Sequence, residues 1–503
     1  MKYLIAHDIG TSADKATLFN AEGRMVKTAV VPYTTHYFDG VCAEQSPEDW
    51  WTAVCRSTRA LTSDINAGDV AAISFSGQMQ GLLCVDKQGR PLRPFIIWAD
   101  VRASKEAKEL AERISPRRLY TTTGHPLNSS YTLEKLMWVK KHEPDVYSKT
   151  YKILSAKDYI VLRITGRYLM DYSNASATNA MDICNMKWSE DIMSAANVDG
   201  EMFPELTDAV TIAGEVGAQT AKEVGLRPGT PVVVGGGDGQ CASVGAGSVS
   251  EGKAYISMGS SAWISVASAK TVFDDAMTIT NFAHIVPGMV CPSGTMQTAG
   301  SALEWMKNNI GDKTMSGDKA DAYAALDTLV ESAAAGSQSL LFLPYMMGER
   351  APRWNPDAKG TFVGLKLTHT RGDMLRSVIE GIAMNLNVIL QTLRKDITID
   401  ELGVIGGMAK GDIVCRILAD VMETPIRRLK NMGEVSSMGA AVVAGVGVGL
   451  FHDFSAIERF METDELFLPD EANARVYNRM KPLFDEAYFA LEGLFSRLSE
   501  VGK

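Results

Sequence analysis

The sequence predicts an α/β protein made of two similar domains that face a central cleft, and two repeated patterns lead to this prediction. A strand, a turn rich in hydroxyl side chains and a second strand occur at residues 3–19 and again at residues 254–267. A strand that ends in paired glycines before a helix occurs at residues 232–242 and again at residues 402–412. Because each half of the chain holds one copy of both patterns, a duplicated α/β architecture follows.

Length and composition agree with two domains. The chain has 503 residues, 46% of them apolar, and this length is too great for one hydrophobic core. We therefore expect an N-terminal domain at residues 1–246 and a C-terminal domain at residues 247–503. The seven cysteines show no metal-ligand spacing, so we expect them to be reduced.

Charge and hydropathy restrict the partners. A net charge of −10 offers no basic surface for nucleic acid. The sequence has no terminal apolar run typical of a signal peptide and no run of about 18 apolar residues that would span a membrane, so we expect a cytoplasmic protein without membrane contact. A homodimer stays open, because a symmetric interface needs only a surface patch.

The chain is organised around the stretch TPVVVGGGDGQCA at residues 230–242. A short apolar strand breaks into Gly235, Gly236 and Gly237, and Asp238 follows at once. Glycines permit a sharp turn, and ligands of α/β sheets bind beyond the carboxyl ends of strands, so Asp238 is a candidate for a carboxylate that faces the cleft. The alternative is that Asp238 caps a helix beginning at the next residue. This stretch alone leaves both interpretations open.

The N-terminal hairpin is a candidate phosphate site. A strand at residues 2–7 enters a turn at residues 8–15, DIGTSADK, and a second strand follows. Backbone amides in such a turn bind anions, and the hydroxyl groups of Thr11 and Ser12 add donors. A plain hairpin is the alternative, but it gives Asp8 no structural duty.

The remaining periodic segments predict scaffold. Strands are expected at residues 70–76 and 82–85, and Trp138 is expected to pack rather than to bind a ligand. Apolar spacing and capping residues predict helices at residues 47–61, 104–113, 132–142, 156–165, 371–395 and 470–500, the last with a kink at Pro482.

Two loops carry residue types that suit a sugar. In GQMQG, residues 77–81, amide side chains between two strands can meet hydroxyl groups, although an ordinary polar loop has the same composition. Trp98, Asp100 and Arg102 combine an aromatic face with charged groups that bind hydroxyls, but a core tryptophan and an N-cap aspartate are alternatives. Two phosphate-type turns from opposite halves of the chain fit a nucleoside triphosphate.

Several separate stretches together resemble the FGGY carbohydrate kinases over nearly the whole chain, and among these the xylulose kinases. The stretches are DIGTSADK (8–15), EQSPEDWW (44–51), GQMQG (77–81), WADVR (98–102), SSYTLEKLMWVKKHEP (129–144), GGGD (235–238), MGSSAW (258–263), FLPYMMGERAP (342–352), GTFVGLKLTHTRGDMLRSVIEG (360–381) and GGMAKGD (406–412). The resemblance implies an actin-like, ribonuclease H-like fold, in which two ATPase-type domains flank a central cleft with ATP in it and the sugar deeper on the N-terminal side.

The resemblance also implies roles for individual residues. It makes Asp238 the general base and lets Asp8 help to hold Mg²⁺ through water. The residues implied to bind the phosphates of ATP are Gly10, Thr11, Ser12, Lys15, Gly259, Ser260 and Ser261. Those implied to bind its adenosine are Gly406, Gly407 and Ala409. The candidates for the sugar are Met79, Gln80, Trp98, Asp100 and Arg102.

The activity implied is the ATP-dependent phosphorylation of a ketopentose, with D-xylulose preferred and D-xylulose 5-phosphate as product. The chain departs from typical bacterial xylulose kinases, which have His at Gln80, Asn at Gly239 and Asn at Ala99, and Met408 replaces a glycine of the adenosine turn. These departures leave ribulose, another pentulose, a polyol or gluconate as alternative substrates. A non-catalytic sugar- or nucleotide-binding protein is the other alternative, but such a protein would not need Asp238 beside the acceptor hydroxyl.

Overall fold

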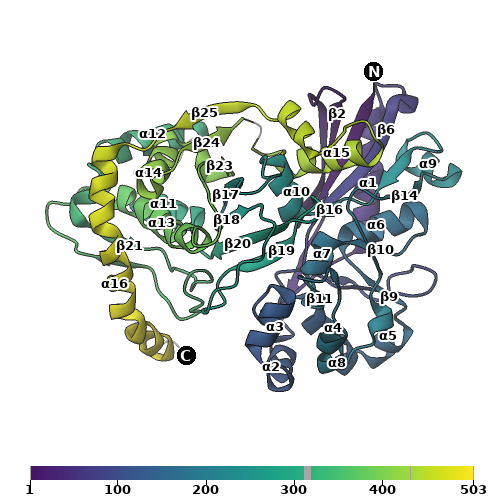
Figure 1. The fold of residues 1–503 in the computed structure, drawn as a ribbon, viewed down its shortest axis with the longest axis horizontal. Helices are drawn as coiled ribbons and strands as arrows, with labels where there is room; N and C mark the ends of the chain where they lie inside the picture. Colours follow the sequence, from purple (N-terminus) through teal and green to yellow (C-terminus); the bar gives the residue numbers. More distant parts are fainter. Residues whose placement is uncertain (1, 311–318, 431, 502–503) are drawn as a thin grey trace.

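Two seven-stranded sheets organise the molecule, one in each lobe of the computed structural model (Figure 1), which describes residues 2–310, 319–430 and 432–501. The N-terminal sheet has the strand order β14 (Ile212–Glu215), β15 (Pro231–Val233), β6 (Val70–Gly77), β1 (Tyr3–Ile9), β2 (Ala13–Asn20) and β3 (Met25–Pro32), and β16 (Gly236–Gly237) pairs with β6. The C-terminal sheet has the order β19 (Thr280–Ala283), β20 (Val290–Met296), β18 (Ala262–Val266), β17 (Ala254–Met258), β23 (Leu402–Ile405), β24 (Ile426–Leu429) and β25 (Thr463–Phe467).

The two sheets repeat one topology. In each, three antiparallel strands are followed by two parallel strands and then by one antiparallel edge strand: β3, β2, β1, β6, β15 and β14 correspond to β20, β18, β17, β23, β24 and β25. The duplication expected from the repeated sequence patterns is therefore confirmed.

Strand register brings three segments with candidate site residues to one edge of the N-terminal sheet. Strands β1 and β16 both run parallel to β6, with Asp8 opposite Ser76 on one side and Gly236 opposite Ser76 on the other. The carboxyl ends of parallel strands share one edge of a sheet. The ends of β1, β6 and β16 consequently lie side by side.

Helices cover both faces of the N-terminal sheet. On one face, α1 (Pro47–Thr62) packs through residues such as Trp50 and Val54 against Ile5 and Leu18. On the other face lie α10 (Asp238–Gly245) and α15 (Val435–Gly447), which contact strand residues such as Leu4. Alternate residues of a strand point to opposite faces, which is why neighbouring residues of β1 enter different clusters.

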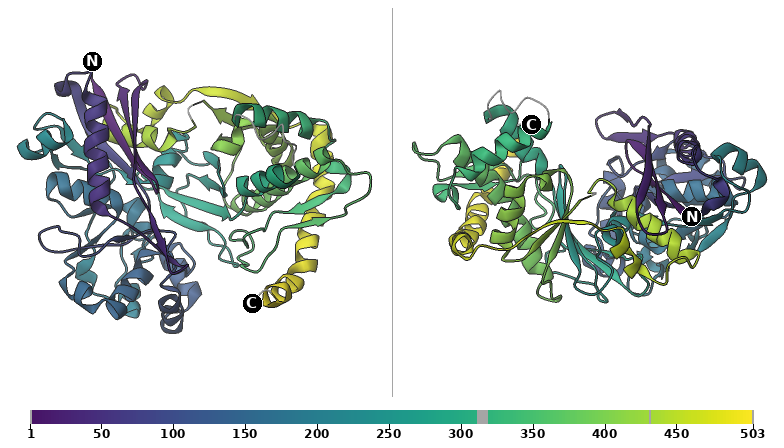
Figure 2. Two further views of the ribbon diagram at one scale, coloured as in Figure 1. Left: turned by 180° about the vertical axis from the view of Figure 1, so that it is seen from behind. Right: turned by 90° about the horizontal axis from the view of Figure 1, so that it is seen from above.

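The helix α15 comes from the C-terminal half of the chain but belongs to the N-terminal sheet. Figure 1 and Figure 2 show it, in yellow-green, beside the purple strands. Its residues Met438 and Val442 share a buried cluster with Phe19 of β2 and with Phe454 and Ile457 of the following segment. The expected domain boundary between residues 246 and 247 assigned α15 to the C-terminal domain, whereas the helix packs on the N-terminal sheet.

The helices predicted by apolar spacing are present. Three have the predicted bounds: α2 (Ser104–Arg113), α4 (Thr132–His142) and α6 (Ala156–Thr165). The long helix α13 (Arg371–Leu393) ends two residues before its prediction, and α16 (Glu471–Val501) continues through Pro482. The prediction that Trp138 packs is confirmed, because it contacts the buried cluster around α4. None of the helices in the described residues is both long and apolar enough to cross a membrane.

The strands of the two hairpins extend further than predicted. The pairs Asp8 with Lys15 and Ile9 with Asp14 continue the ladder of β1 and β2, so the turn contains only residues 10–12 instead of 8–15. In the second hairpin, β18 begins at Ala262. Both turns are therefore three residues long.

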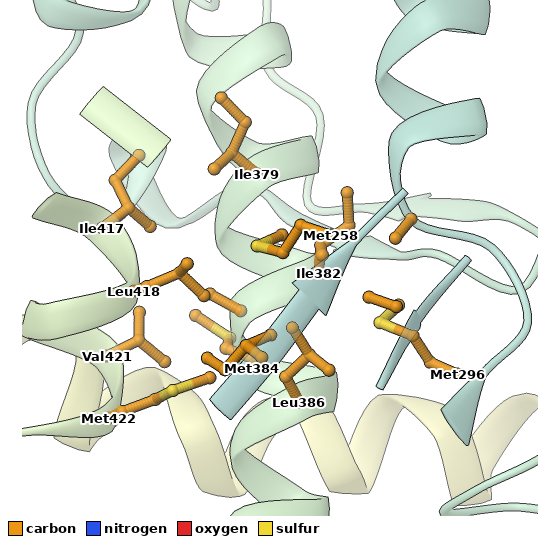
Figure 3. Close-up of a cluster of buried hydrophobic side chains, with 14 of the residues drawn as sticks. Met258, Met296, Ile379, Ile382, Met384, Leu386, Ile417, Leu418, Val421 and Met422 are labelled. Atoms are coloured by element: carbon orange, nitrogen blue, oxygen red, sulfur yellow. The ribbon is translucent and has the colours of Figure 1, made fainter. Parts of the chain in front are cut away.

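The C-terminal core forms around α13. Ile379, Ile382 and Leu386 of this helix meet Leu418 and other residues of α14 (Asp412–Met422), and Met258 and Met296 reach the same cluster from the sheet (Figure 3). All of these side chains are buried. The cluster supports the sheet that carries the second hairpin turn.

Candidate active site

Glycines allow the strand that carries Asp238 to end against the neighbouring strand. Gly235 has φ +77°, and a Cβ atom there would clash with the carbonyl oxygen of Phe75. A Cβ atom at Gly237 would lie 2.5 Å from the Sδ atom of Met79. The backbone of this segment therefore packs directly on β6 and on the loop after it.

Asp238 is the first residue of α10, and Gly237 is its N-cap. The alternative in which Asp238 caps a helix starting at Gly239 is wrong by one residue. The amide of Gly239 donates to Oδ1 of Asp238 at 2.8 Å. Burial and, to a smaller extent, the negative charge of Asp8 together raise the pKa of the Asp238 carboxyl to about 7. This carboxyl can exchange a proton near neutral pH.

Asp8 lies at the same edge of the sheet. The hydroxyl group of Ser76 donates to Oδ1 of Asp8 at 2.9 Å. Burial raises the pKa of the Asp8 carboxyl, while the hydrogen bond from Ser76 and the charge of Lys15 oppose the rise. The charge of Asp8 acts on Asp238, and a cation near these two buried carboxyl groups would favour their ionised forms.

The donor set at this edge fits Mg²⁺. The part of the chain that the structure describes has no group of three or more His, Cys, Asp and Glu side chains arranged to hold a metal ion. Mg²⁺ is commonly held by one or two carboxylates together with water and phosphate oxygens, so Asp8 suffices as its protein contact.

The scaffold holds the first hairpin turn by its carbonyl groups. Gly10 O accepts from the hydroxyl of Tyr33 at 2.6 Å, and Thr11 O accepts from Nε2 of Gln45 at 2.5 Å. Ser12 O accepts from the amide of Tyr33 at 3.1 Å. The amide of Gly10 donates to Ala13 O at 3.1 Å within the turn, so the groups that the turn can offer to phosphate are the amides and hydroxyls of Thr11 and Ser12.

Lys15 has partners in the C-terminal half of the chain. Its ammonium group donates to Gly433 O at 2.5 Å and lies 3.6 Å from Oε1 of Glu434. The hydroxyl of Thr17 donates to the other carboxylate oxygen of Glu434 at 3.0 Å. Lys15 thus anchors the segment that leads into α15, and its contact with phosphate stays a prediction.

The second hairpin turn, residues 259–261, is held in the same manner. The amides of Gly300 and Ala299 donate to Gly259 O and Ser260 O at 3.0 and 2.8 Å. These donors stand at the start of α11 (Gly300–Ile310). A Cβ atom at Gly300 would lie 2.5 Å from Gly259 O, so only glycine permits this approach. Sequence reasoning missed Gly300, because its partner Gly259 lies 41 residues earlier in the chain.

The two glycines of the predicted adenosine turn differ in their surroundings. Gly406 has φ +102°, and a Cβ atom there would clash with the carbonyl oxygen of Met258. At Gly407 an added Cβ atom would meet no atom within 4 Å. Met408 and Ala409 are buried in the C-terminal core. The side chain of Met408 therefore fills the core rather than the open space at Gly407.

One residue of the predicted sugar-binding set, Trp98, contacts the first hairpin turn. The indole N–H of Trp98 donates to the hydroxyl of Thr11 at 2.9 Å, and Trp98 is 45% exposed, so a core position for this tryptophan is wrong. Met79 packs against Gly237. Gln80 has φ +64°, and its carbonyl oxygen accepts from Nζ of Lys135 at 2.9 Å.

Asp100 and Arg102 bind each other. The Arg102 guanidinium lies 2.7 Å from the Asp100 carboxylate and 2.8 Å from that of Glu44. Asp100 is fully buried and also accepts from the amide of Ala43 at 2.6 Å. The N-cap of α2 is Ala103, so the N-cap alternative for Asp100 is wrong. Both side chains thus bond to each other and to scaffold groups, and their role in binding sugar stays a prediction.

The chain is similar to known carbohydrate kinases in both halves. Residues 3–245 match the N-terminal domain of the FGGY family of carbohydrate kinases, and residues 254–448 match the C-terminal domain. A xylulose kinase of Staphylococcus xylosus is 31% identical over 97% of this chain and 100% of its own length. A gluconokinase of Bacillus subtilis is 28% identical over 99% of this chain and 98% of its own.

A solved structure supports the same conclusion. The ligand-bound xylulose kinase from Lactobacillus acidophilus has a TM-score of 0.92 and 27% identity, covering 99% of this chain and 100% of that one. The predicted two-domain, actin-like fold is thereby confirmed, and membership of a kinase family implies the use of ATP. The protein belongs to the FGGY family of carbohydrate kinases.

Proposed function

We propose that this carbohydrate kinase transfers the γ-phosphoryl group of ATP to D-xylulose and releases D-xylulose 5-phosphate and ADP. One observation carries the proposal: the Asp238 carboxyl, whose pKa is raised to about 7, stands at a sheet edge beside a second carboxyl, Asp8. The 31% identity to a xylulose kinase over nearly the whole chain supports the choice of sugar.

The proposed base is Asp238. The oxygen of the terminal sugar hydroxyl bonds to the γ-phosphorus while the bond from this phosphorus to the β,γ-bridging oxygen breaks, and ADP leaves. The hydroxyl proton passes to Asp238, which is suited to this task because the pKa of an effective base lies near the working pH. Mg²⁺ bound through water at Asp8 would supply positive charge to the phosphate oxygens.

The two hairpin turns are proposed to hold the phosphates from opposite lobes. Hydrogen bonds engage the carbonyl groups of these turns and the amides of Gly10 and Gly259, which leaves the amides and hydroxyls of the residues after these glycines for the anion. The proposed phosphate ligands are Gly10, Thr11, Ser12, Lys15, Gly259, Ser260 and Ser261. Adenosine would lie at Gly406, Gly407 and Ala409, where the open space beside Gly407 has room for it.

The sugar is proposed to contact Met79 and Gln80 in the loop after β6. Trp98, Asp100 and Arg102, in the loop after β8 (Phe95–Ile96), are proposed to complete its site. The bond from Trp98 to Thr11 joins this group to the first phosphate turn. Closure of the two lobes would exclude water from the phosphoryl group and limit hydrolysis of ATP.

Gluconate is the second candidate substrate. A gluconokinase is nearly as similar to this chain as the xylulose kinase is, with 28% identity over 99% of the chain. Beside Asp238, Gly239 has no side chain, and an added Cβ atom there would meet only Met79, at 3.9 Å. This space would admit a longer substrate than a pentulose.

The test is ADP release with Mg-ATP across xylulose, ribulose, gluconate, erythritol and glycerol. We expect xylulose to give the highest kcat/KM, and ADP release without sugar to be slow. A higher kcat/KM with gluconate would overturn the choice of xylulose and establish the second candidate. Equal, slow release with every compound would overturn both.

A further inference from the structure

A buried polar cluster lies beside β16, the short strand that leads into Asp238, and none of the steps proposed above uses it. The ammonium group of Lys157 lies 2.6 Å from the carboxylate of Asp158 and 2.8 Å from that of Asp171. All three side chains are buried. A buried charge is costly unless it is paired and hydrogen-bonded, so each of these groups restricts the position of the others.

Hydrogen bonds connect this cluster to the active-site backbone through Ser173. Asp171 Oδ2 accepts from both the hydroxyl and the amide of Ser173, the amide at 2.8 Å. Oγ of Ser173 in turn accepts from the amide of Gly237 at 2.8 Å. Because its hydrogen is directed to Asp171, the hydroxyl presents a lone pair to Gly237. Gly237 is the residue immediately before Asp238.

The cluster also packs closely on the strands around this point. A Cβ atom at Gly77 would lie 3.0 Å from Cβ of Lys157, and one at Gly236 would lie 3.2 Å from Oγ of Ser173. Strand β16 has only two residues, which pair with Ser76 and Gly77. A strand of two residues is held by few ladder hydrogen bonds. The bond from the Gly237 amide to Ser173 therefore adds to the contacts that fix its position.

We propose that Ser173 is a positioning residue for phosphoryl transfer. Its hydroxyl holds the Gly237 amide, and Asp171, which is paired with Lys157, holds that hydroxyl. The start of α10 is thereby fixed, and the carboxylate of Asp238 stays where it can meet the acceptor hydroxyl. This inference rests on the proposed role of Asp238 as base. It assigns to three buried residues the task of holding the base in place.

The test compares Ser173→Ala with Thr178→Val. The hydroxyl of Thr178 is also buried and also accepts from one backbone amide, that of Ala180 at 3.1 Å, but it donates to Ala175 O, and neither partner adjoins Asp238. We expect Ser173→Ala to lower kcat roughly 10- to 100-fold with KM for ATP within about twofold, because a misplaced catalytic group costs rate rather than nucleotide binding. Thr178→Val should keep kcat within about threefold of wild type.

A double-mutant cycle shows whether Ser173 acts through Asp238. If it does, Ser173→Ala will lower the residual rate of Asp238→Asn by less than about threefold, since the group that it positions is already absent. Equal losses of kcat in Ser173→Ala and Thr178→Val, or effects of Ser173→Ala and Asp238→Asn that multiply, would overturn the inference.

The two proposals fail in different ways. A wild-type rate in Asp238→Asn would overturn the base assignment and this inference with it. A wild-type rate in Ser173→Ala alone would overturn only the inference. Should Ser173→Ala not fold, Ser173→Cys takes its place, because the thiol is a weak hydrogen-bond acceptor of similar size and the same loss of kcat is expected.

Discussion

Burial raises the pKa of both carboxyl groups at the edge of the N-terminal sheet, and the negative charge of Asp8 adds to the rise at Asp238. Each proton that leaves places a charge where the surroundings disfavour it. An enzyme gains a base that works near neutral pH in this way, and it loses stability in exchange.

Replacing Asp238, the proposed base, should stabilise the fold at high pH. The pKa of Asp238 is about 7 in the fold against an ordinary value of 3.8, so the folded state prefers the protonated form. Stability is therefore lost as the pH rises from about 4 to about 7, and remains lost above it. Asp238→Asn carries no such charge, so we expect its Tm to exceed that of wild type by about 2 °C or more at pH 8.

The gap in Tm should close at pH 4, and thermal unfolding at both pH values measures it. The same variant should keep ATP binding and lose at least about 100-fold in kcat, the usual contribution of a general base. A gap of equal size at pH 4 and pH 8 would show that titration of Asp238 does not affect stability.

The pH dependence of the rate should report the coupled pair of Asp8 and Asp238. At low concentrations of sugar and Mg-ATP, the rate should fall tenfold per pH unit below an apparent pKa of about 7, which belongs to the pair. Saturating Mg-ATP should move this limb to lower pH, because a cation near Asp8 favours the ionised carboxylates. Rate profiles at low and saturating Mg-ATP test this. An acid limb at the same pH in both would contradict it.

At the scale of elements, helices were predictable because their signals are local. Helix α6 begins with a capping box formed by Ser155 and Asp158, and α13 begins with one formed by Thr370 and Asp373. The turn of the first hairpin was predicted too long, because the polar residues of 8–15 are typical of turns. Asp14 lies in β2, buried, and accepts from Ser57 Oγ at 2.6 Å, and this partner is far away in the sequence.

The same reason explains which parts of the site the sequence could indicate. Asp238 and the glycines before it form one local pattern, and so do the two turns. The role of Ser173 depends on a contact with Gly237, 64 residues later, and the role of Gly300 depends on a contact with Gly259. Contacts between distant segments leave no local pattern, so these residues became visible only in the structure.

The adjacent glycines of the adenosine turn should respond differently to alanine. Gly406→Ala should destabilise the fold by about 2 kcal/mol or more, because φ is +102° and the new Cβ atom would clash with Met258 O. Gly407→Ala should leave Tm nearly unchanged, since its Cβ atom enters open space. If adenosine occupies that space, the second variant should weaken ADP binding about tenfold.

Thermal unfolding and calorimetric titration with ADP measure the two effects separately. Unchanged ADP affinity in Gly407→Ala would move the nucleoside away from this turn. A wild-type Tm in Gly406→Ala would contradict the clash at Met258.

At the scale of the whole molecule, the C-terminal half returns to complete the N-terminal lobe. Helix α15 is almost entirely buried, with apolar residues on all sides, so its sequence has no polar face to reveal which sheet it covers. It packs closely on α10, the helix that begins with Asp238. The integrity of the active site thus depends on both halves of the chain.

Separating these two helices should affect stability and catalysis together. A Cβ atom at Gly439 of α15 would clash with the carbonyl oxygen of Cys241 in α10. We expect Gly439→Ala to cost about 3 kcal/mol or more in the free energy of unfolding, because backbone cannot yield as a flexible side chain can. The displaced α10 should carry Asp238 with it, and kcat should fall at least about tenfold at temperatures where the variant is folded.

The matched control is Gly493→Ala in α16, where an added Cβ atom meets nothing within 4 Å. Alanine is the better helix former, so this change should raise stability by up to about 1 kcal/mol and leave kcat unchanged. Urea unfolding and kcat of both variants complete the comparison. A Gly439→Ala protein that unfolds earlier but keeps the wild-type kcat would show that α15 stabilises the lobe without positioning Asp238. Wild-type stability in the same variant would show that α10 and α15 can move apart at no cost.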